Sequence, residues 1–142
     1  MYGRERMNPK ELYDMAVTAA KKAYSPYSKF CVGAALLCDD GTVYTGCNIE
    51  NASYSVTVCA ERVALFTAVA EGKRKFTAIA VAGSGDGDFS SPCPPCGVCR
   101  QALVEFCSPD MPVILADGNG GVAEHTLGEI LPMSFTAEDM EK

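Results

Sequence analysis

Cys59-Ala60-Glu61 and, further along, Pro95-Cys96-Gly97-Val98-Cys99 are the stretches that determine what this chain folds around. Three potential thiolates and one carboxylate are the minimum set for a zinc ion that activates a water molecule beside its own proton carrier. A Cys-x-x-Cys pair alone also occurs in thiol redox motifs and structural zinc knuckles. The Glu two residues after a third Cys is what makes the combination specific.

Each cysteine group lies where a loop is expected to enter a helix. Backbone N–H groups are left free at a helix N-terminus, and together with the helix dipole they favour a thiolate over a thiol. Two such helix starts that face each other would bring Cys59, Cys96 and Cys99 to one Zn²⁺. The alternative is that all three are buried apolar thiols, the usual state of free cysteine.

Cys93 offers a second alternative, a closed structural zinc site with four cysteine ligands. Cys93-Pro94-Pro95-Cys96 also has the Cys-x-x-Cys spacing. However, proline has no N–H group with which to support a cysteine sulfur. The pair Cys96 and Cys99 has such donors, so we expect an open site with three protein ligands.

Glu61 and Arg62 extend this prediction from metal binding to catalysis. A carboxylate beside the metal can take a proton from water and relay it to a substrate nitrogen. The alternative is a Glu placed in a first helical turn because the dipole favours anions there. A guanidinium from Arg62 would offset the negative charge that three thiolates leave on Zn²⁺, unless Arg62 is an ordinary surface residue. The only histidine, His125, is far from both motifs and is not expected to be a ligand.

Length and composition predict one globular domain over residues 1–142. The net charge of −6 argues against nucleic acid as a partner, because neutralising phosphates requires an excess of Lys and Arg. No apolar run could span a bilayer, and residues 1–10 lack the apolar core of a signal peptide. We therefore expect a soluble cytoplasmic protein, in which the eight cysteines are thiols and metal ligands.

Hydrophobic periodicity and turn residues predict helices alternating with strands. The expected helices cover residues 9–24, 61–71 and 99–106, and the expected strands cover 30–38, 42–47, 76–82 and 113–116, with a final short strand after the turn at 118–121. A loop over 48–58 would deliver residues to the site. This order predicts an α/β fold with three α/β/α layers and a central mixed sheet of about five strands.

From these motifs outward the chain resembles the cytidine deaminase family, in its small homotetrameric zinc-dependent class. The two cysteine stretches match, with Cys in the first position, the zinc-deaminase signature H-x-E followed by P-C-x-x-C. The resemblance covers nearly the whole length, and the matching stretches are Ser25-Pro26-Tyr27-Ser28-Lys29-Phe30, Val32-Gly33-Ala34-Ala35-Leu36-Leu37, Gly46-Cys47-Asn48-Ile49-Glu50-Asn51-Ala52, Cys59-Ala60-Glu61-Arg62 and Cys96-Gly97-Val98-Cys99-Arg100-Gln101. The family usually has Ser-Pro-Cys-Gly-x-Cys, whereas Cys93-Pro94-Pro95 precedes Cys96 here.

The resemblance implies further roles at matching positions. Phe30 would stack on the pyrimidine, Asn48 and Glu50 would bind the ribose hydroxyls, and the Ala60 backbone would contact the base. The resemblance also implies a homotetramer. Exposed aromatic residues, Tyr54 and Phe135, would reach into a neighbouring subunit's site.

We therefore predict zinc-dependent hydrolytic deamination of cytidine and deoxycytidine to uridine and deoxyuridine in pyrimidine salvage. Glu61 would carry the proton from water to N3 and then to the departing amine. Three alternatives stay open at this point: a deaminase of a nucleoside-like antibiotic such as blasticidin S, a polynucleotide-editing deaminase, and a non-enzymatic zinc-binding interaction module.

Overall fold

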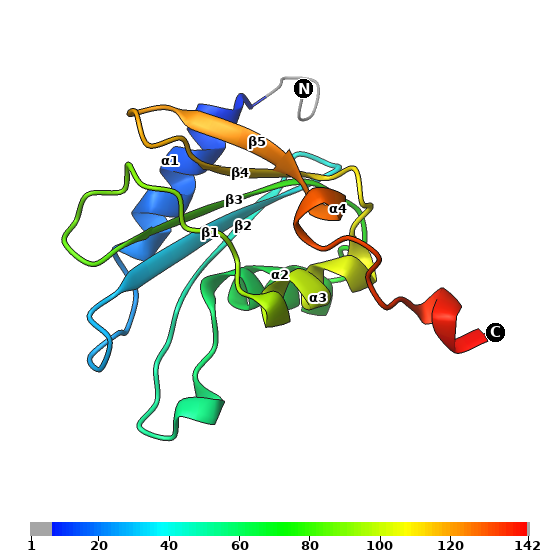
Figure 1. Ribbon diagram of the computed structural model, residues 1–142, viewed down its shortest axis with the longest axis horizontal. Coiled ribbons are helices and arrows are strands. Elements are labelled where there is room, and N and C mark those ends of the chain that lie inside the picture. The colour runs from blue at the N-terminus through cyan, green and yellow to red at the C-terminus, as the bar shows by residue number, and fades with distance from the viewer. Residues whose placement is uncertain (1–6, 142) are drawn as a thin grey trace.

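A five-stranded mixed sheet organises the computed structural model, which describes residues 7–141 (Figure 1). Its strands are β1 (Cys31–Cys38), β2 (Val43–Cys47), β3 (Phe76–Ser84), β4 (Pro112–Ala116) and β5 (Val122–Thr126). Their order in the sheet is β2-β1-β3-β4-β5, with β3 and β4 parallel and the other neighbouring pairs antiparallel. The predicted mixed sheet of about five strands is confirmed.

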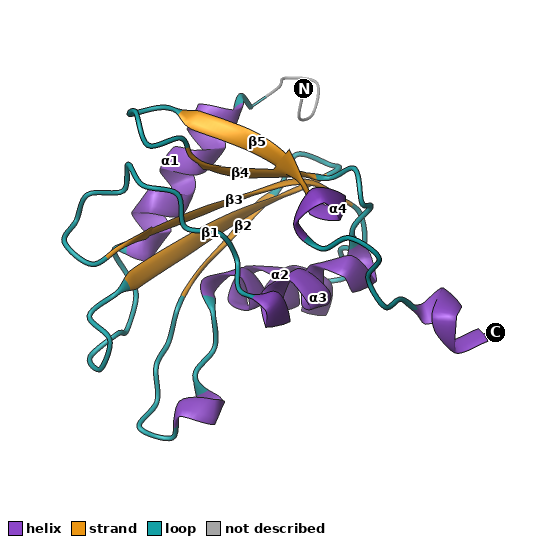
Figure 2. Cartoon of the chain, in the orientation of Figure 1, coloured by secondary structure: helices purple, strands orange, loops and turns teal. Residues whose placement is uncertain are grey.

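Helices cover both faces of this sheet (Figure 2). They are α1 (Pro9–Ala20), α2 (Ala60–Ala70), α3 (Gly97–Phe106) and the short α4 (Leu127–Ile130), with 3₁₀ helices η1 (Tyr54–Val56) and η2 (Ala137–Glu141). One buried cluster joins α1 to the sheet and a second joins α2 and α3 to its other face. The predicted three-layer α/β/α arrangement is therefore confirmed.

Strand β1, an interior strand of the sheet, explains why both faces need helices. Ala35 and Leu37 belong to the buried cluster beneath α1, whereas Ala34 and Leu36 belong to the cluster beneath α2. Successive side chains of a strand point to opposite faces, so a strand with an unbroken apolar run must be covered on both.

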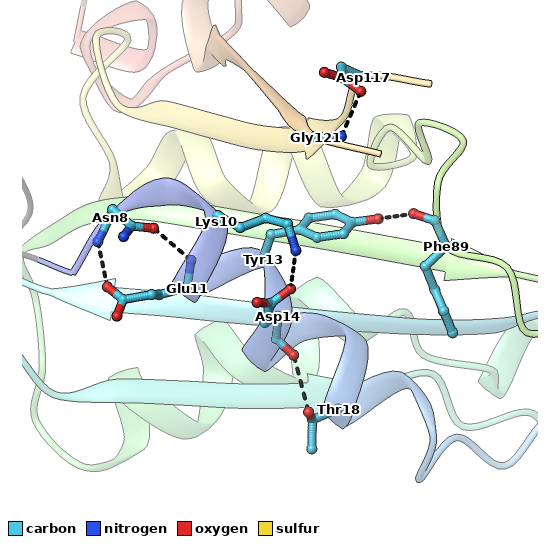
Figure 3. A network of polar contacts seen from close by, with 9 residues as sticks. All are labelled: Asn8, Lys10, Glu11, Tyr13, Asp14, Thr18, Phe89, Asp117 and Gly121. Carbon is cyan, nitrogen blue, oxygen red and sulfur yellow. Dashed lines mark hydrogen bonds and ion pairs between the residues drawn. The ribbon is translucent and has the colours of Figure 1, made fainter. Parts of the chain in front are cut away.

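The first helix begins as the sequence predicts but ends earlier. Asn8 and Glu11 form a capping box in which each side chain accepts a hydrogen bond from the other residue's backbone N–H (Figure 3). The helix ends at Ala20 rather than at the predicted Tyr24. Tyr24 instead forms a bridge with Ile49, and its carbonyl accepts from the Glu50 N–H at 2.8 Å. This bridge positions the start of the 48–58 loop.

The loop that precedes α3 is tied to α1 on the other side of the molecule. The Tyr13 hydroxyl donates to the Phe89 carbonyl at 2.5 Å (Figure 3). Tyr13 itself is buried in the cluster between α1 and the sheet. The bond therefore holds the loop over residues 85–96, which leads to Cys96, against the body of the domain.

Within residues 7–141, no helix has both the length and the apolar character that a membrane crossing requires. The sequence predicts no signal peptide over residues 1–10, and residues 1–6 of that segment lie outside the described residues.

Candidate metal centre

Three cysteines converge where α2 and α3 begin. Cys59 is the N-cap residue of α2, Cys96 is the N-cap residue of α3, and Cys99 lies in the first turn of α3. The Sγ atoms of Cys59 and Cys96 are 3.7 Å apart, those of Cys96 and Cys99 are 3.5 Å apart, and all three lie within 4.8 Å of one another. The structure thus brings together the three residues that the sequence indicated.

This spacing fits a zinc ion. A tetrahedral Zn²⁺ with Zn–S bonds of about 2.3 Å requires sulfur–sulfur distances of about 3.8 Å. Among residues 7–141, no fourth Cys, His, Asp or Glu ligand atom joins the group. Cys99 is fully buried and Cys96 is exposed, so the cluster opens on one side. Three protein ligands with an open fourth position are typical of catalytic rather than structural zinc sites.

Positive charge from Arg62 supports the thiolate form of Cys59. The Arg62 Nη2 donates to the Cys59 Sγ at 3.6 Å. A hydrogen bond with the Cys99 thiol and the bond from Arg62 together lower the pKa of Cys59 to about 5. The same cysteines raise the pKa of Arg62, which keeps it charged. This placement favours the charge-compensating role over that of an ordinary surface arginine.

Glu61 projects from the first turn of α2 beside the cluster. It is only 3% exposed, and this burial, together with the nearby Cys59, raises the pKa of its carboxyl group to about 7. Its Oε1 is buried and has no hydrogen-bond partner among the described residues. Because an unpaired buried carboxylate oxygen is costly, this atom indicates that a polar ligand belongs next to it.

A cavity of about 170 Å³ lies against the cluster. Its walls include Glu61, Cys59 and Cys96 from the two helix starts, Val32 and Asn48 from the ends of β1 and β2, and Cys93 from the loop before α3. The cavity therefore joins the candidate metal ligands, the candidate proton carrier and one of the predicted substrate-binding residues.

Asn48 and Glu50 shape the approach to this cavity from one short segment. The Asn48 side chain accepts from the Val32 N–H and donates to the Phe30 carbonyl, both at 2.9 Å. Glu50 accepts from the backbone N–H groups of Tyr27 and Ser28 at 3.0 and 3.1 Å, and hydrogen bonds from Ser28 lower the pKa of its carboxyl group.

Glu50 faces a neighbouring hollow of about 330 Å³ rather than the metal-site cavity itself. Tyr54 also lines this hollow, and Thr57 lines both spaces. A nucleoside placed with its base beside Glu61 thus has room for its sugar toward Glu50. Thr57 was missed in the sequence because nothing in its local pattern separates it from other loop residues.

The remaining predicted residues lie in different surroundings. Ala60 is fully buried at the start of α2, next to the cavity wall. Phe30 is 40% exposed and lies against β3 near Cys93. His125 is in β5, opposite Val113, and lines no part of the cavity.

Tyr54 and Phe135 are not brought into the metal-site cavity by their own chain. Tyr54 is 74% exposed and packs edge-on against Tyr27 with 6.1 Å between ring centroids. Phe135 is 60% exposed, and its carbonyl accepts from the Gln101 side chain at 2.8 Å. Their segments project away from the body of the domain (Figure 2).

Comparison with known proteins places these features in a family. Residues 7–115 match the model of the cytidine and deoxycytidylate deaminase zinc-binding region. The chain is 52% identical to a cytidine deaminase of Halalkalibacterium halodurans over 94% of this chain and 98% of that protein. It is 49% identical to a cytidine deaminase of Sporosarcina psychrophila over 94% and 96% of the two chains. The crystal structure of cytidine deaminase from Burkholderia pseudomallei superposes with a TM-score of 0.82 at 46% identity, covering 91% of this chain and 100% of that one.

Proposed function

The chain belongs to the cytidine and deoxycytidylate deaminase family, and from this premise we propose how its residues deaminate a pyrimidine nucleoside. The reaction is the zinc-dependent hydrolysis of cytidine and deoxycytidine to uridine and deoxyuridine with release of ammonia. The observation that carries the proposal is the partnerless, buried Glu61 Oε1 beside three converging cysteines.

Cys59, Cys96 and Cys99 would hold the zinc ion. When bound, zinc supplies Lewis acidity, which lowers the pKa of a water molecule toward neutrality. Arg62 offsets the charge of the thiolates through its bond to Cys59.

Glu61 transfers the protons of the reaction. With a pKa raised to about 7, its carboxyl group can both accept and donate a proton near neutral pH. It accepts a proton from water as the water oxygen bonds to C4, and it delivers that proton to N3 of the pyrimidine. It then takes the remaining proton from the new C4 hydroxyl and gives it to the exocyclic amine as the C4–N bond breaks, so that C4 becomes a carbonyl carbon and ammonia leaves.

The same proposal assigns substrate binding. Phe30 stacks on the base, Asn48 and Glu50 bind the ribose hydroxyls, and the Ala60 backbone contacts the base. The position of Asn48 in the cavity wall and of Glu50 in the adjoining hollow supports this assignment.

We further propose one deaminase domain over residues 1–142 that assembles as a homotetramer, in which Tyr54 and Phe135 complete a neighbour's site. The large exposed fractions of both aromatic side chains support this assembly. We also propose a role in pyrimidine salvage in the cytoplasm, without a nucleic-acid partner. All eight cysteines are free thiols and the net charge is −6, as such a setting favours.

The test is ammonia release from cytidine and deoxycytidine, measured before and after removal of zinc with a chelator and again after zinc is restored. Blasticidin S and a single-stranded RNA serve as competing substrates. We expect zinc-dependent turnover of both nucleosides that exceeds turnover of the other two compounds. Faster release of ammonia from blasticidin S or RNA, or full activity in zinc-free protein, would contradict the proposal.

A further inference from the structure

Cys93 lines the metal-site cavity but does not belong to the three-cysteine cluster. A Cβ atom on Gly83 would lie 2.5 Å from the Cys93 Sγ and 2.9 Å from the Phe30 Cε2. Real Cβ atoms essentially never come this close to another heavy atom. Gly83 therefore leaves room on β3 for the Cys93 thiol and the Phe30 ring to lie next to each other.

The cavity that Cys93 lines is marked independently as a ligand site. Glu61 lines the same cavity, and only 3% of its surface is exposed. Its buried Oε1 has no hydrogen-bond partner among the residues described. That oxygen requires a polar group within the cavity. Cys93 is thus part of the wall that surrounds a ligand.

The orientation of a bound pyrimidine determines which edge of its ring faces the Cys93 side of the cavity. In the proposed function, C4 lies at the three-cysteine cluster and N3 lies at Glu61. C5 is the other ring neighbour of C4, so it points away from Glu61. The sugar lies toward Asn48 and Thr57, and Thr57 also lines the adjoining hollow of Glu50. The walls that are left for the C5 edge are Val32, Val58, Cys93 and Pro94, of which Cys93 and Pro94 come from the loop before α3.

We propose that Cys93 is a specificity-determining residue, whose side chain sets how large a substituent the pyrimidine can carry at C5. The inference rests on the proposed function. A free thiol in an apolar setting behaves as a small hydrophobic group. One extra or missing methyl group in an apolar pocket changes the ratio of kcat/KM values for two substrates by about 10- to 200-fold. A change in side-chain volume at Cys93 should therefore give a measurable change in this ratio.

The experiment compares kcat/KM for cytidine and for 5-methylcytidine. The variants are Cys93→Ala, which removes volume, and Cys93→Val, which adds it. Cys107→Ala is the matched control, because Cys107 is a buried free thiol that lies outside the cavity wall. We expect the ratio of kcat/KM for 5-methylcytidine to that for cytidine to rise about 10-fold in Cys93→Ala and to fall about 10-fold in Cys93→Val. The control should keep the wild-type ratio.

A binding measurement separates this inference from the proposed function. Titration calorimetry gives Kd for uridine and for 5-methyluridine, and the zinc content of each protein is measured in parallel. The Kd ratio should shift in the same directions as the kcat/KM ratio, at unchanged zinc content. Unchanged ratios in either Cys93 variant, or loss of zinc from Cys93→Ala, would overturn the inference. A wild-type protein that binds both uridines but releases no ammonia from cytidine would overturn the proposed function instead.

Discussion

Arg62 illustrates how one side chain can favour the thiolate form of a neighbouring cysteine, Cys59. Its bond to the Cys59 Sγ, at 3.6 Å, is one of the causes that hold the pKa of Cys59 near 5. In Arg62→Gln the thiolate loses this support, so the pKa of Cys59 rises and protons compete better with zinc. We expect the variant to release zinc at a higher pH than wild type during acid titration.

The measurement is zinc release against pH, followed with a zinc-sensitive dye. Arg74→Gln is the control, because the Arg74 guanidinium donates to the backbone carbonyls of Val69 and Lys73 near the end of α2. Identical release curves for wild type and Arg62→Gln would return Arg62 to an ordinary structural role.

At the level of single residues, the chemistry was predictable and the cavity wall was not. Cys59, Cys96 and Cys99 stand out because three thiols and a carboxylate at these spacings have few other uses. Cys93 stood out only as a possible fourth ligand, and the structure places it outside the ligand group, in the cavity wall. Its real neighbours, Gly83 and Phe30, come from distant segments, so no local pattern could reveal them.

At the level of elements, α2 is positioned by its close approach to β2. A Cβ atom on Gly46 would lie 2.5 Å from the Ala60 carbonyl oxygen and 2.7 Å from the Ala64 nitrogen. Gly33, on the neighbouring strand, has the matching relation to α1, with 2.0 Å to the Ala16 carbonyl oxygen. Each glycine thus lets one helix lie on the sheet.

This pair of glycines allows the metal site to be separated from general stability. Gly46→Ala and Gly33→Ala should each destabilise the fold by about 1–3 kcal/mol, because both push a helix off the sheet. Only Gly46→Ala should also weaken zinc binding, since α2 carries Cys59 and Glu61. Urea unfolding and zinc affinity measure the two effects, and equal loss of zinc affinity in both variants would contradict this account.

The bond from Tyr13 to Phe89 links α1 to the loop before α3. Tyr13→Phe removes it, and we expect a loss of about 1 kcal/mol in the free energy of unfolding near neutral pH. Burial, with smaller effects of Cys93, Asp14 and Asp88, raises the pKa of Tyr13 from 10.0 to about 12. A raised pKa of this kind gives stability that is complete below 10.0 and is lost as pH rises through about 12.

Urea unfolding across this alkaline window tests the assignment. Wild type should lose a component of stability that Tyr13→Phe lacks, and the control Tyr27→Phe, at a tyrosine that is 49% exposed, should behave as wild type. A wild-type alkaline profile in Tyr13→Phe would contradict the role of this hydroxyl.

Element types followed from the sequence more reliably than element ends. The capping boxes are local signals, because Asn8 and Glu11, like Thr126 and Glu129, have the three-residue spacing that a capping box requires, and both boxes form. The predicted end of α1 at Tyr24 is wrong, because the helical pattern of the sequence continues beyond Ala20, where the helix ends. Tyr24 instead forms a bridge with Ile49, which lies in a segment distant in sequence. Strand β3 likewise extends to Ser84, beyond the predicted end, because it pairs with Cys31 in β1.

For the whole molecule, the layer order followed from the sequence because an unbroken apolar strand requires helices on both faces. Assembly depends on surfaces that one chain cannot display, and it stays a prediction. We expect light scattering to give a tetramer. Deletion of residues 135–142 should raise KM for cytidine more than it lowers zinc content.

The single substitution Phe135→Ala refines this test, with Met140→Ala, an exposed residue of the same C-terminal segment, as its control. Phe135→Ala should raise KM and Met140→Ala should not. A monomer with full activity would contradict the assembly.

The central claim is that Glu61 carries the protons in a zinc-dependent deamination, and one comparison tests it most directly. Ammonia release from cytidine is measured for wild type and Glu61→Gln at matched zinc content. The substitution keeps the shape of the side chain but removes its basic group, so turnover should fall by at least about 10²-fold while substrate binding persists. Turnover close to that of wild type, with zinc fully bound in both proteins, would contradict the account.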